Sequence, residues 1–453
     1  MGWVLRLVET GPDSAARSVD LIEIDRPARL ADIADLGLTL AEAKQLLARV
    51  QQVMVAAQAR GHAGHRPGCA SCDGRCHVKD WRPHQIATPF GGVALRLPRW
   101  LCSRCGETAT GISWPANCRS TPALDQLHAH LSALMTYRVA AGVLAYLLPV
   151  ETSTSPETLR GHALKVGEQL RDAATVRPAT VAPAISISLD STFIRSCHEG
   201  ERHIEVRVGN VETPGAGRQV FGAVAKSDTD ILELIGRTLE TMGRTRGTRL
   251  TAFTDGCCGL RSILADAGVT KPPILDWFHI AMRLQHAKLA ASGLEDDTPD
   301  RVAAKALIVE QVERLHWRIW NGKAKNARVT IDRIRKVMHV FKGETGHRKA
   351  AASSGKLWHA LHAISDYLTG QSHWLVNYAK RYRAGLRVGT SITEGTANFL
   401  VNRRMNKSQQ MRWSRRGADL LLQVRCAVYN GALGNGFGRL FDPEPCQQLA
   451  KVA

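Results

Sequence analysis

The sequence lacks any long, uninterrupted apolar run. Its most apolar window, 131–150, contains Arg138 near the middle and Gly142 and Pro149 further on, and a membrane-spanning helix tolerates such residues poorly. The chain also starts without a basic segment followed by an apolar stretch, which is the pattern of a secretory signal. We therefore expect a soluble, cytoplasmic protein with no membrane partner.

Acidic residues are scarce in the C-terminal third. Residues 301–440 hold 26 Lys and Arg but only 7 Asp and Glu, while the rest of the chain holds 34 of each. This one segment therefore carries the whole formal net charge of +19. So polarised a distribution is typical of a surface that binds a polyanion such as nucleic acid. A basic surface that only keeps the protein in solution is the alternative.

A disulfide framework is also not indicated. The chain has 11 cysteines, an odd number, and several stand in Cys-x-x-Cys pairs, which favours a reducing compartment and metal binding. Two such pairs flank a stretch with β character, and together they offer Cys69, Cys72, Cys102 and Cys105. Four thiolates complete a tetrahedral shell around Zn²⁺ and leave no open position, so we expect a structural zinc site.

Other ligands compete for that zinc. Gly106 suits the turn that directs amide groups at sulfur in the second pair. The rival ligands are Cys76, His62, His65 and His77. A pair of reduced, buried thiols without metal is the remaining alternative.

Strand and helix patterns alternate regularly after residue 183. The first predicted strand, 184–195, places Ile185, Ile187 and Leu189 on one face and Asp190 on the other. Strands are also predicted at 203–209 and 219–225, followed by a helix over 230–242. A fourth strand ends at Asp255 and a fifth at Asp276, each followed by a helix. This element order predicts a ribonuclease-H-like α/β catalytic domain.

Composition and pattern divide the chain into six segments. We expect an N-terminal helical appendage (1–60), a zinc-binding knuckle or ribbon (61–118), a helical DNA-binding segment (119–176), the first part of the α/β core (183–292), a basic α-helical insertion (293–388) and helices that complete the core (389–440). Two short helices and a third that begins at Pro156 fit a helix-turn-helix, although any helical connector would have the same pattern. Tryptophans within the insertion could stack on bases but are more often core residues.

The chemistry is predicted from three carboxylates. Asp190 and Asp255 are carried by strands, and Glu394 lies near the start of a predicted helix on which Asn398 and Asn402 share its face. A few carboxylates that leave positions for water and phosphate oxygens suit Mg²⁺ or Mn²⁺, and two such ions support in-line displacement at a phosphodiester. Each carboxylate taken alone has a simpler structural explanation, as a turn residue or as a favourable charge at a helix N-terminus.

Several motifs resemble one known family. Ser-Leu-Asp190-Ser-Thr, Phe-Thr-Asp255-Gly, Leu-Asp276-Trp-Phe-His279 and Glu394-Gly-Thr-Ala-Asn398 occur in order, followed by Arg403-Arg404-Met405 and Met411-Arg412-Trp413. Phe90-Gly91-Gly running into Cys102-Ser-Arg-Cys105-Gly106 adds to them. Together they resemble the ISKra family of bacterial insertion-sequence transposases, which is related to the Mutator-like DDE enzymes. The resemblance covers about residues 65–430.

The resemblance implies specific roles. Asp190, Asp255 and Glu394 would be the acidic triad, and Asp276 and His279 would match a motif that lies between the second and third acidic residues. A structural hydrogen bond is an equal alternative for that motif. The reaction would be metal-dependent cleavage at transposon ends and transfer of the 3′-hydroxyl into target DNA, by a homodimer or higher oligomer on double-stranded DNA. Phosphate contacts are expected from Arg403, Arg404, Lys407, Arg412, Arg415 and Arg416.

Two other classes of protein remain open. One is a domesticated transposase descendant that binds specific DNA sequences without cutting, although the intact triad argues against it. The other is a ribonuclease-H-like nuclease or resolvase that does not transfer strands. The zinc and helical segments upstream favour a protein that recognises specific DNA ends.

Overall fold

Two compact units make up the chain in this computed structural model. One comprises Met1–Asp172 with Ala427–Ala453, and the other Ala173–Cys426. The structure describes residues 1–10, 17–29, 32–110, 112, 119–150, 155–173, 180–213, 217–224, 227–341, 352–389, 395–406 and 411–433. None of the helices in these ranges combines the length and the apolar character needed to cross a bilayer.

The first unit begins with a β-hairpin that the sequence patterns did not predict. β1 (Gly2–Glu9) pairs antiparallel with β2 (Arg17–Asp25), and the short 3-10 helix η1 (Ile33–Asp35) follows. The appendage is therefore not simply helical. Nearly all side chains of the hairpin are exposed or half-buried, so apolar and polar residues do not alternate as they do in a strand with one buried face. The predicted helix is confirmed as α1 (Leu40–Gly64), which Thr39 and Glu42 close with a capping box.

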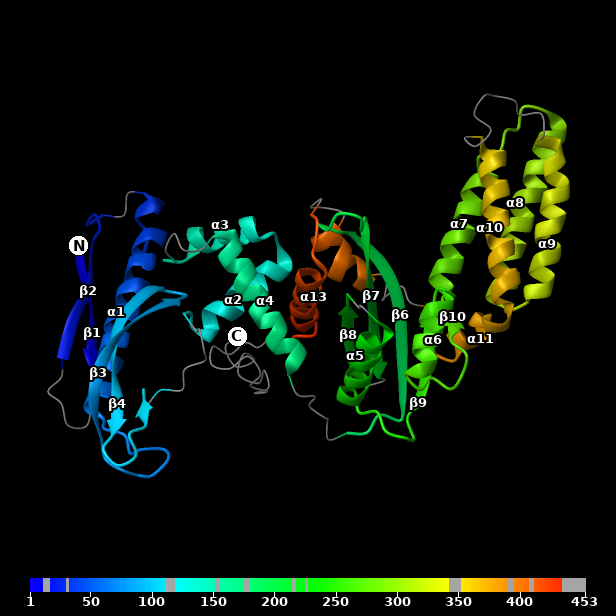
Figure 1. Ribbon diagram of the computed structural model, residues 1–453. Helices are drawn as coiled ribbons and strands as arrows, with labels where there is room; N and C mark the ends of the chain where they lie inside the picture. The colour runs from blue at the N-terminus through cyan, green and yellow to red at the C-terminus, as the bar shows by residue number, and fades with distance from the viewer. Residues whose placement is uncertain are drawn as a thin grey trace. The chain divides into compact units, whose positions relative to one another are not determined.

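A three-stranded sheet and three helices complete the described part of this unit. The sheet consists of β3 (Cys76–Thr88), β4 (Gly91–Cys102) and β5 (Thr108–Ala109), all antiparallel. The helices are α2 (Pro122–Leu134), α3 (Tyr137–Leu147) and α4 (Pro156–Asp172). They pack around Ala140, Leu144, Leu159 and Ala163, which are at most 2% exposed. The predicted helices of this segment are confirmed, and α1 lies along β3 and β4 (Figure 1).

The second unit is built on a five-stranded sheet. Its strands are β6 (Ala184–Arg195), β7 (His203–Thr213), β8 (Gly217–Ala223), β9 (Arg249–Thr254) and β10 (Ile274–Leu275), in the order β10-β9-β6-β7-β8. The pairs β6–β7 and β7–β8 are antiparallel, whereas β9 runs parallel to both β6 and β10. Each of the five predicted strands is present.

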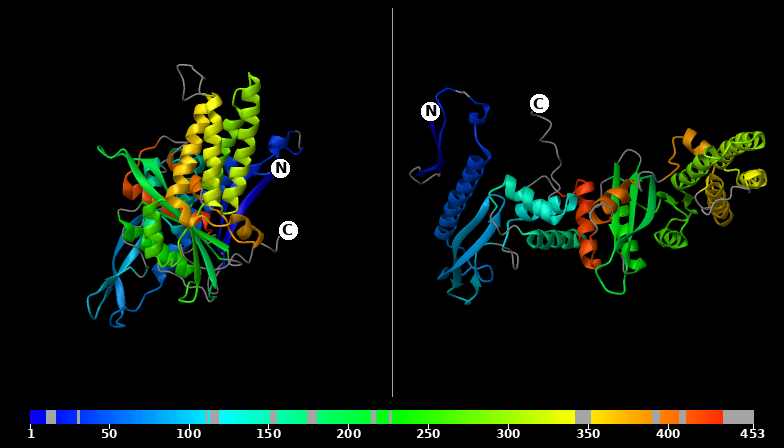
Figure 2. Two further views of the ribbon diagram at one scale, coloured as in Figure 1. Left: turned by 90° about the vertical axis from the view of Figure 1, so that its right-hand side faces the viewer. Right: turned by 90° about the horizontal axis from the view of Figure 1, so that it is seen from above.

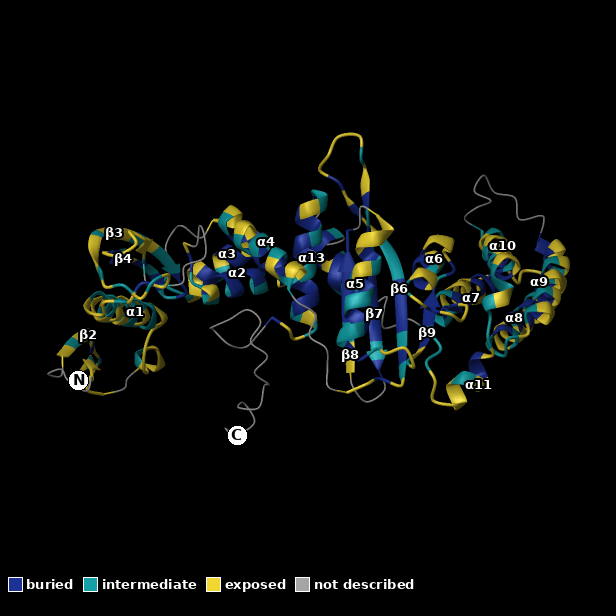
Figure 3. Ribbon diagram, turned by 60° about the horizontal axis from the view of Figure 1, so that its bottom comes forward, coloured by how far each residue is buried: buried dark blue, intermediate teal, exposed yellow. Residues whose placement is uncertain are grey.

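Helices cover both faces of this sheet. One face holds α5 (Asp228–Thr241) and α6 (Cys258–Asp266), whose apolar residues pack on Ile185, Ile187 and Leu189. These three side chains are at most 1% exposed, and burying each contributes roughly 1.5–3 kcal/mol. On the other face, the π-helix η4 (Asn398–Asn406) and α13 (Arg415–Tyr429) pack on Ile194 and its neighbours in β7 and β8. Buried residues dominate α13 in Figure 3.

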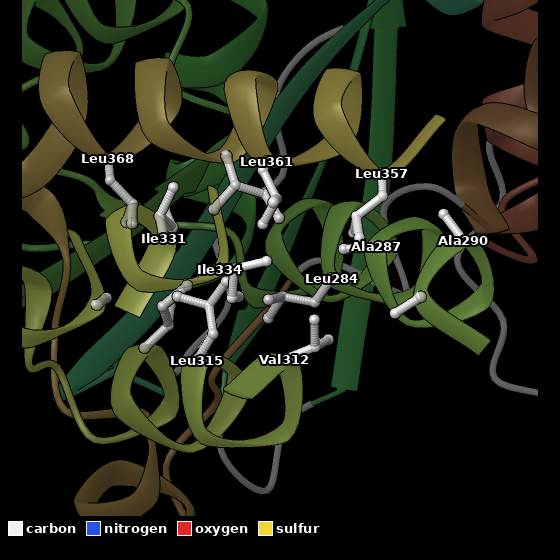
Figure 4. Close-up of a cluster of buried hydrophobic side chains, with 14 of the residues drawn as sticks. Leu284, Ala287, Ala290, Val312, Leu315, Ile331, Ile334, Leu357, Leu361 and Leu368 are labelled. Carbon is white, nitrogen blue, oxygen red and sulfur yellow. The ribbon is translucent and has the colours of Figure 1, made fainter. Parts of the chain in front are cut away.

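A helical bundle is inserted between β10 and η4. It contains α7 (Trp277–Ser292), α8 (Pro299–Trp320), α9 (Ala324–Val337) and α10 (Ser353–Gln371), followed by α11 (Tyr378–Arg383), with the short 3-10 helices η2 (Met338–Phe341) and η3 (Ser372–Trp374). The four long helices run side by side (Figures 1 and 2) and share one apolar core, part of which Figure 4 shows. The predicted helical insertion is confirmed. The tryptophans of the bundle have two kinds of environment. Trp320 packs against Trp277. Trp317 and Trp358 are about half exposed and lie beside Lys323 and Arg335, respectively.

A buried polar cluster joins α2 to α4. Asp125 accepts hydrogen bonds from Ser120 Oγ at 2.5 Å, His162 Nδ1 at 2.5 Å and Lys165 Nζ at 2.8 Å. His128 lies beside His162, with ring centroids 4.7 Å apart, and neither of its ring nitrogens has a hydrogen-bond partner among the described residues. Burial, assisted by the proximity of His162 and opposed by Asp125, lowers the pKa of His128 from 6.5 to about 4.

This pKa predicts how the stability of the three-helix segment depends on pH. Between pH 6.5 and 4 the unfolded chain binds a proton at His128 that the folded chain does not, so stability falls as the pH drops through that window. At pH 5 the loss is about 2 kcal/mol relative to pH 7. Amide hydrogen exchange of α2 and α4 at the two pH values measures it. His128→Leu should remove most of the pH dependence, and His130→Gln on the same helix should not; an unchanged pH dependence in His128→Leu would contradict the assignment.

Candidate functional site

Asp190 lies on β6, and Asp255 and Asp276 directly follow the neighbouring strands β9 and β10; these three residues form the aspartate row. The pairing of β6 with β9 reaches Ser188 opposite Phe253, and continuing this register by two residues sets Asp190 opposite Asp255. The pairing of β9 with β10 reaches Leu275 opposite Thr254, so one further step sets Asp276 opposite Asp255. Neighbouring strands are about 4.8 Å apart. The fold therefore brings together the two predicted strand carboxylates and adds a third.

Asp190 has a strongly perturbed carboxyl group. Burial raises its pKa from 3.8 to about 6, and the negative charges of Asp255 and Asp276 act in the same direction. A hydrogen bond from the Ser191 N–H, at 2.8 Å to Oδ1, and the nearby His279 oppose the shift. The Asp190 side chain thus stands among like charges in a partly buried position, an arrangement that a cation would relieve.

Asp255 begins a tight turn that the inserted bundle holds in place. Its Oδ1 accepts the Cys257 N–H at 2.9 Å, and Gly256 follows at φ +99°. From α10, the Tyr367 hydroxyl donates to the Asp255 carbonyl at 2.9 Å, and Gln371 Nε2 donates to the Gly256 carbonyl at 3.0 Å. Asp255 therefore does act as a turn residue, but its turn is clamped by a helix more than 110 residues later in the chain.

Asp276 performs a structural task. It is fully buried, and its Oδ1 caps α7 by accepting the Phe278 N–H at 2.9 Å. Its Oδ2 lies 3.6 Å from Nε2 of His279, whose side chain is 24% exposed. Of the two alternatives for this motif, the geometry supports the structural hydrogen bond for Asp276. His279 is the member of the pair that solvent reaches.

Arg387 and Gly389 belong to this site, although the sequence patterns did not single them out. Arg387 donates to Ser188 Oγ at 3.3 Å, to Asn210 Oδ1 at 3.1 Å and to the Gly389 carbonyl at 2.9 Å. The Val388 carbonyl accepts the Trp277 N–H at 3.3 Å. A Cβ at Gly389 would lie 2.7 Å from Asp276 Oδ1, so only glycine fits there. Arg387 can be recognised as a site residue only from its burial, because it lies between two elements that are distant in the sequence.

Glu394 lies outside the described residues, and so does Lys407. The residues that follow Glu394 are informative, because Thr396 and Ala397 are at most 4% exposed and Ala397 packs with Ile194, Val206 and Val208. Ile194 and Asp190 point to the same side of β6, since their positions differ by an even number. Asn398, at the start of η4, is half-buried.

The predicted phosphate contacts differ in their access to solvent. Arg403, Arg412 and Arg416 are exposed, and Arg415 pairs with Glu201. Arg404 does not fit the prediction, because it is 1% exposed and lies with its guanidinium over Trp413, 5.5 Å from the ring centre. Its basic sequence context suggests an exposed phosphate contact. The side chain is instead buried by contacts with distant residues, which the sequence around it does not reveal.

A basic pocket lies at the end of β6. Its volume is about 550 Å³, and its lining includes Arg195, Arg202, Arg412, His198 and Glu201. Of these, Glu201 is already paired with Arg415. The backbone of Trp413 holds one wall by pairing with β6, since its N–H donates to the Arg195 carbonyl at 2.9 Å and its carbonyl accepts the Cys197 N–H at 2.9 Å.

The four predicted zinc ligands come together. Sγ of Cys69 lies 3.5 Å from that of Cys105, Sγ of Cys72 lies 3.6 Å from that of Cys102, and all four sulfurs are within 4.8 Å of one another. Zn–S bonds of about 2.3 Å in a tetrahedron place sulfurs about 3.8 Å apart, so the cluster can hold a structural zinc ion. Cys76, His62, His65 and His77 stand outside it. In the described part of the chain, no other group of three such ligands comes this close.

Among the four cysteines, Cys102 has a lowered thiol pKa, whereas the pKa values of Cys69 and Cys72 are raised. Amide groups of Cys105 and Arg104 lower the pKa of Cys102 to about 6, and the Arg104 N–H lies 3.3 Å from its sulfur. Gly106 has φ +74° after the second pair, as predicted, and Asp73 takes the matching position at φ +52° after the first. Gly74 fills the remaining space, because a Cβ there would lie 2.9 Å from Cys102 Sγ and 3.2 Å from Cys72 Sγ.

Comparisons with known proteins do not assign the chain to a family. No protein-family model matches the chain, and no curated protein matches it either.

Gly74 provides a test of the zinc centre. Gly74→Ala should lower the zinc content of the purified protein several-fold, because the new methyl group would overlap two ligand sulfurs. Gly68→Ala is the matched control, since a Cβ at that position meets no atom within 4 Å. Metal content by mass spectrometry, with release measured by a chromogenic chelator, gives the comparison. Full zinc occupancy in Gly74→Ala would show that the metal is not held by this cluster.

Proposed function

We propose that this protein is a DDE transposase of the ISKra type, which cleaves insertion-sequence ends and transfers the 3′-hydroxyl into target DNA. The observation that carries the proposal is that Asp190, on β6, lies close to Asp255 and Asp276, which directly follow the neighbouring parallel strands β9 and β10. Acidic groups at the carboxyl ends of parallel strands, on a sheet with a helical insertion, suit phosphodiester chemistry.

The strand order supports a ribonuclease-H-like core. Three antiparallel strands, β6 to β8, are followed by β9 and β10, which add in parallel on the other side of β6. Helices α5, α6 and α7 follow β8, β9 and β10, so the helices alternate with the last strands. This is the element order that led us to expect the fold.

The chain on either side of Glu394 supports its place in the triad. Before it, Val388 and Arg387 are tied to α7 and β6 next to the aspartate row. After it, Ala397 packs on the face of the sheet that carries Asp190. Five residues separate Glu394 from Gly389, and an extended chain of that length spans at most about 18 Å. The described residues on both sides of Glu394 thus lie beside Asp276 or on the sheet face that carries Asp190, which supports the proposal that Glu394 completes the triad.

The donor set fits Mg²⁺ or Mn²⁺. The carboxylates of Asp190, Asp255 and Glu394 are hard oxygen ligands, and the raised pKa of Asp190 reflects the like charges that a divalent ion would neutralise. When bound, a pair of such ions would activate the attacking oxygen and stabilise the leaving one. Asp190, on the central strand, would hold these ions together with Asp255 and Glu394. Asp276 would fix the turn into α7 and leave His279 to face the substrate.

DNA would be held by basic surfaces around this row. The pocket that contains Arg195, Arg202 and Arg412 lies at the end of the strand that carries Asp190. Exposed Trp317 and Trp358, each beside a cation, are available on the basic insertion for further contacts. The zinc-binding sheet and α2–α4 would recognise the terminal repeats, and two ends would require at least a dimer. Such phosphate contacts make binding strongly dependent on salt.

Asp190→Asn is the first test. Cleavage of a labelled duplex that carries the element's terminal repeat, with Mg²⁺, should fall on the order of 10³-fold or more, because a metal-binding carboxylate is lost. Binding of the same duplex, measured by fluorescence anisotropy, should stay within about threefold, since a neutral side chain repels phosphate less than a carboxylate. Asp266→Asn, an exposed carboxylate on α6, is the matched control and should cut normally.

Glu394→Gln tests the triad assignment in the same assay. It should abolish both cutting and joining. Cutting without joining by the wild-type protein would identify a nuclease or resolvase, and tight binding without cutting would identify a DNA-binding protein of transposase descent. Cutting that survives in Asp190→Asn would exclude this carboxylate as an essential metal ligand.

A further inference from the structure

A second basic cavity lies near the start of β9, whereas the aspartate row lies near the other end of that strand. It is formed where β9 begins, at Arg249 and Leu250, whereas Asp255 follows the other end of that strand. At about 3.3 Å per residue, the six steps along the chain from Arg249 to Asp255 separate the cavity from the row by about 20 Å. Its basic residues are also outside the segment 301–440 that carries the excess positive charge. The cavity is therefore distinct from every surface described above.

The cavity has the size and lining of an anion site. Its volume is about 890 Å³, within the range of small-ligand pockets. Four cations contribute to the wall against one carboxylate, that of Glu240; the cations are Arg244, Arg246, Arg249 and Lys271. Within the described residues, none of these four forms an ion pair with a carboxylate. The threonine hydroxyls at positions 180 and 270 add hydrogen-bond donors.

The loop that carries Arg244 and Arg246 is held by several hydrogen bonds. Gly243 has φ +82°, and Arg244 donates through its backbone N–H to the Leu239 carbonyl at 3.0 Å. Thr248 Oγ1 accepts the Thr245 N–H at 2.9 Å and donates to the Ala182 carbonyl at 2.7 Å. The loop therefore has a fixed shape before any ligand arrives, which reduces the entropy lost on binding.

Arg244 is the most constrained of the four cations. Its Nη1 donates to the Ala267 carbonyl at 3.0 Å, and its guanidinium occupies the space where a side chain at Gly268 would stand. Gly268 itself has φ +90°, a conformation that favours glycine. Arg244 lines the cavity together with the exposed Arg246, Arg249 and Lys271.

We propose that this cavity binds phosphate groups. Guanidinium groups match phosphate oxygens with paired hydrogen bonds, and hydroxyl donors at the wall satisfy the oxygens that remain. The phosphates can belong to a small polyphosphate or to a DNA backbone, and the two sources share this chemistry. In the second case the cavity is an anchor for DNA about 20 Å from the aspartate row. The proposal does not depend on the transposase activity.

The test compares Arg246→Gln/Arg249→Gln with the wild-type full-length protein. Both arginines are exposed, so the double substitution leaves the core intact. Pyrophosphate binding, measured by isothermal titration calorimetry without divalent ions, should be saturable in the wild type and at least about tenfold weaker in the variant. Arg29→Gln/Arg49→Gln, two exposed arginines of the other unit, is the matched control and should bind as the wild type does.

A second arm distinguishes the two sources of phosphate. A labelled duplex of about two helical turns is titrated with each protein in the same divalent-free buffer. Displacement of the duplex by pyrophosphate, together with weaker duplex binding in the cavity variant, supports a DNA backbone contact. Pyrophosphate binding without any effect on the duplex supports a small polyphosphate. Absence of saturable pyrophosphate binding, or equal losses in the cavity and control variants, would overturn the proposal, and neither result bears on cleavage.

Discussion

The shared register of β6, β9 and β10 is the constraint on which the second unit depends. It brings Asp190 close to Asp255 and Asp276, which directly follow β9 and β10, and neighbouring strands are about 4.8 Å apart. Two unit charges about 5 Å apart repel each other by roughly 3 kcal/mol at an effective dielectric constant of about 20. The fold offsets this with local donors. The Ser191 and Cys257 amides each bind one carboxylate, the Phe278 amide binds the third, and His279 stands beside the row.

Much of this core could be predicted from the sequence because its signals are local. Apolar and polar residues alternate at the start of β6 because Ile185, Ile187 and Leu189 all face the apolar core under α5 and α6. The zinc ligands could equally be predicted from the sequence, since the spacing within each Cys-x-x-Cys pair is set by a single turn. The turn after the first pair was not, because Asp73 takes a left-handed conformation that composition alone would assign to glycine.

What could not be predicted depends on contacts between distant segments. The burial of Arg404 results from packing against α13 and Trp413, and the role of Arg387 results from its contact with Ser188 and Asn210. Neither residue differs in type from the exposed arginines around it. The basic cavity beside β9 was also missed, because the sequence does not show that the cluster Arg244, Arg246 and Arg249 meets Lys271 from another loop around one cavity. The position of Glu394 relative to the row is still a prediction.

The inserted bundle has a consequence for how the protein is made. Arg387 closes over Ser188 only after 199 further residues have been added to the chain. At about 5–20 residues per second, this interval lasts roughly 10–40 s. During it the bundle can fold early, because its helices are consecutive in the chain and contact one another. The newly made sheet, by contrast, must wait with its acidic row uncovered, so synthesis of the last third of the second unit sets the moment at which the site is complete.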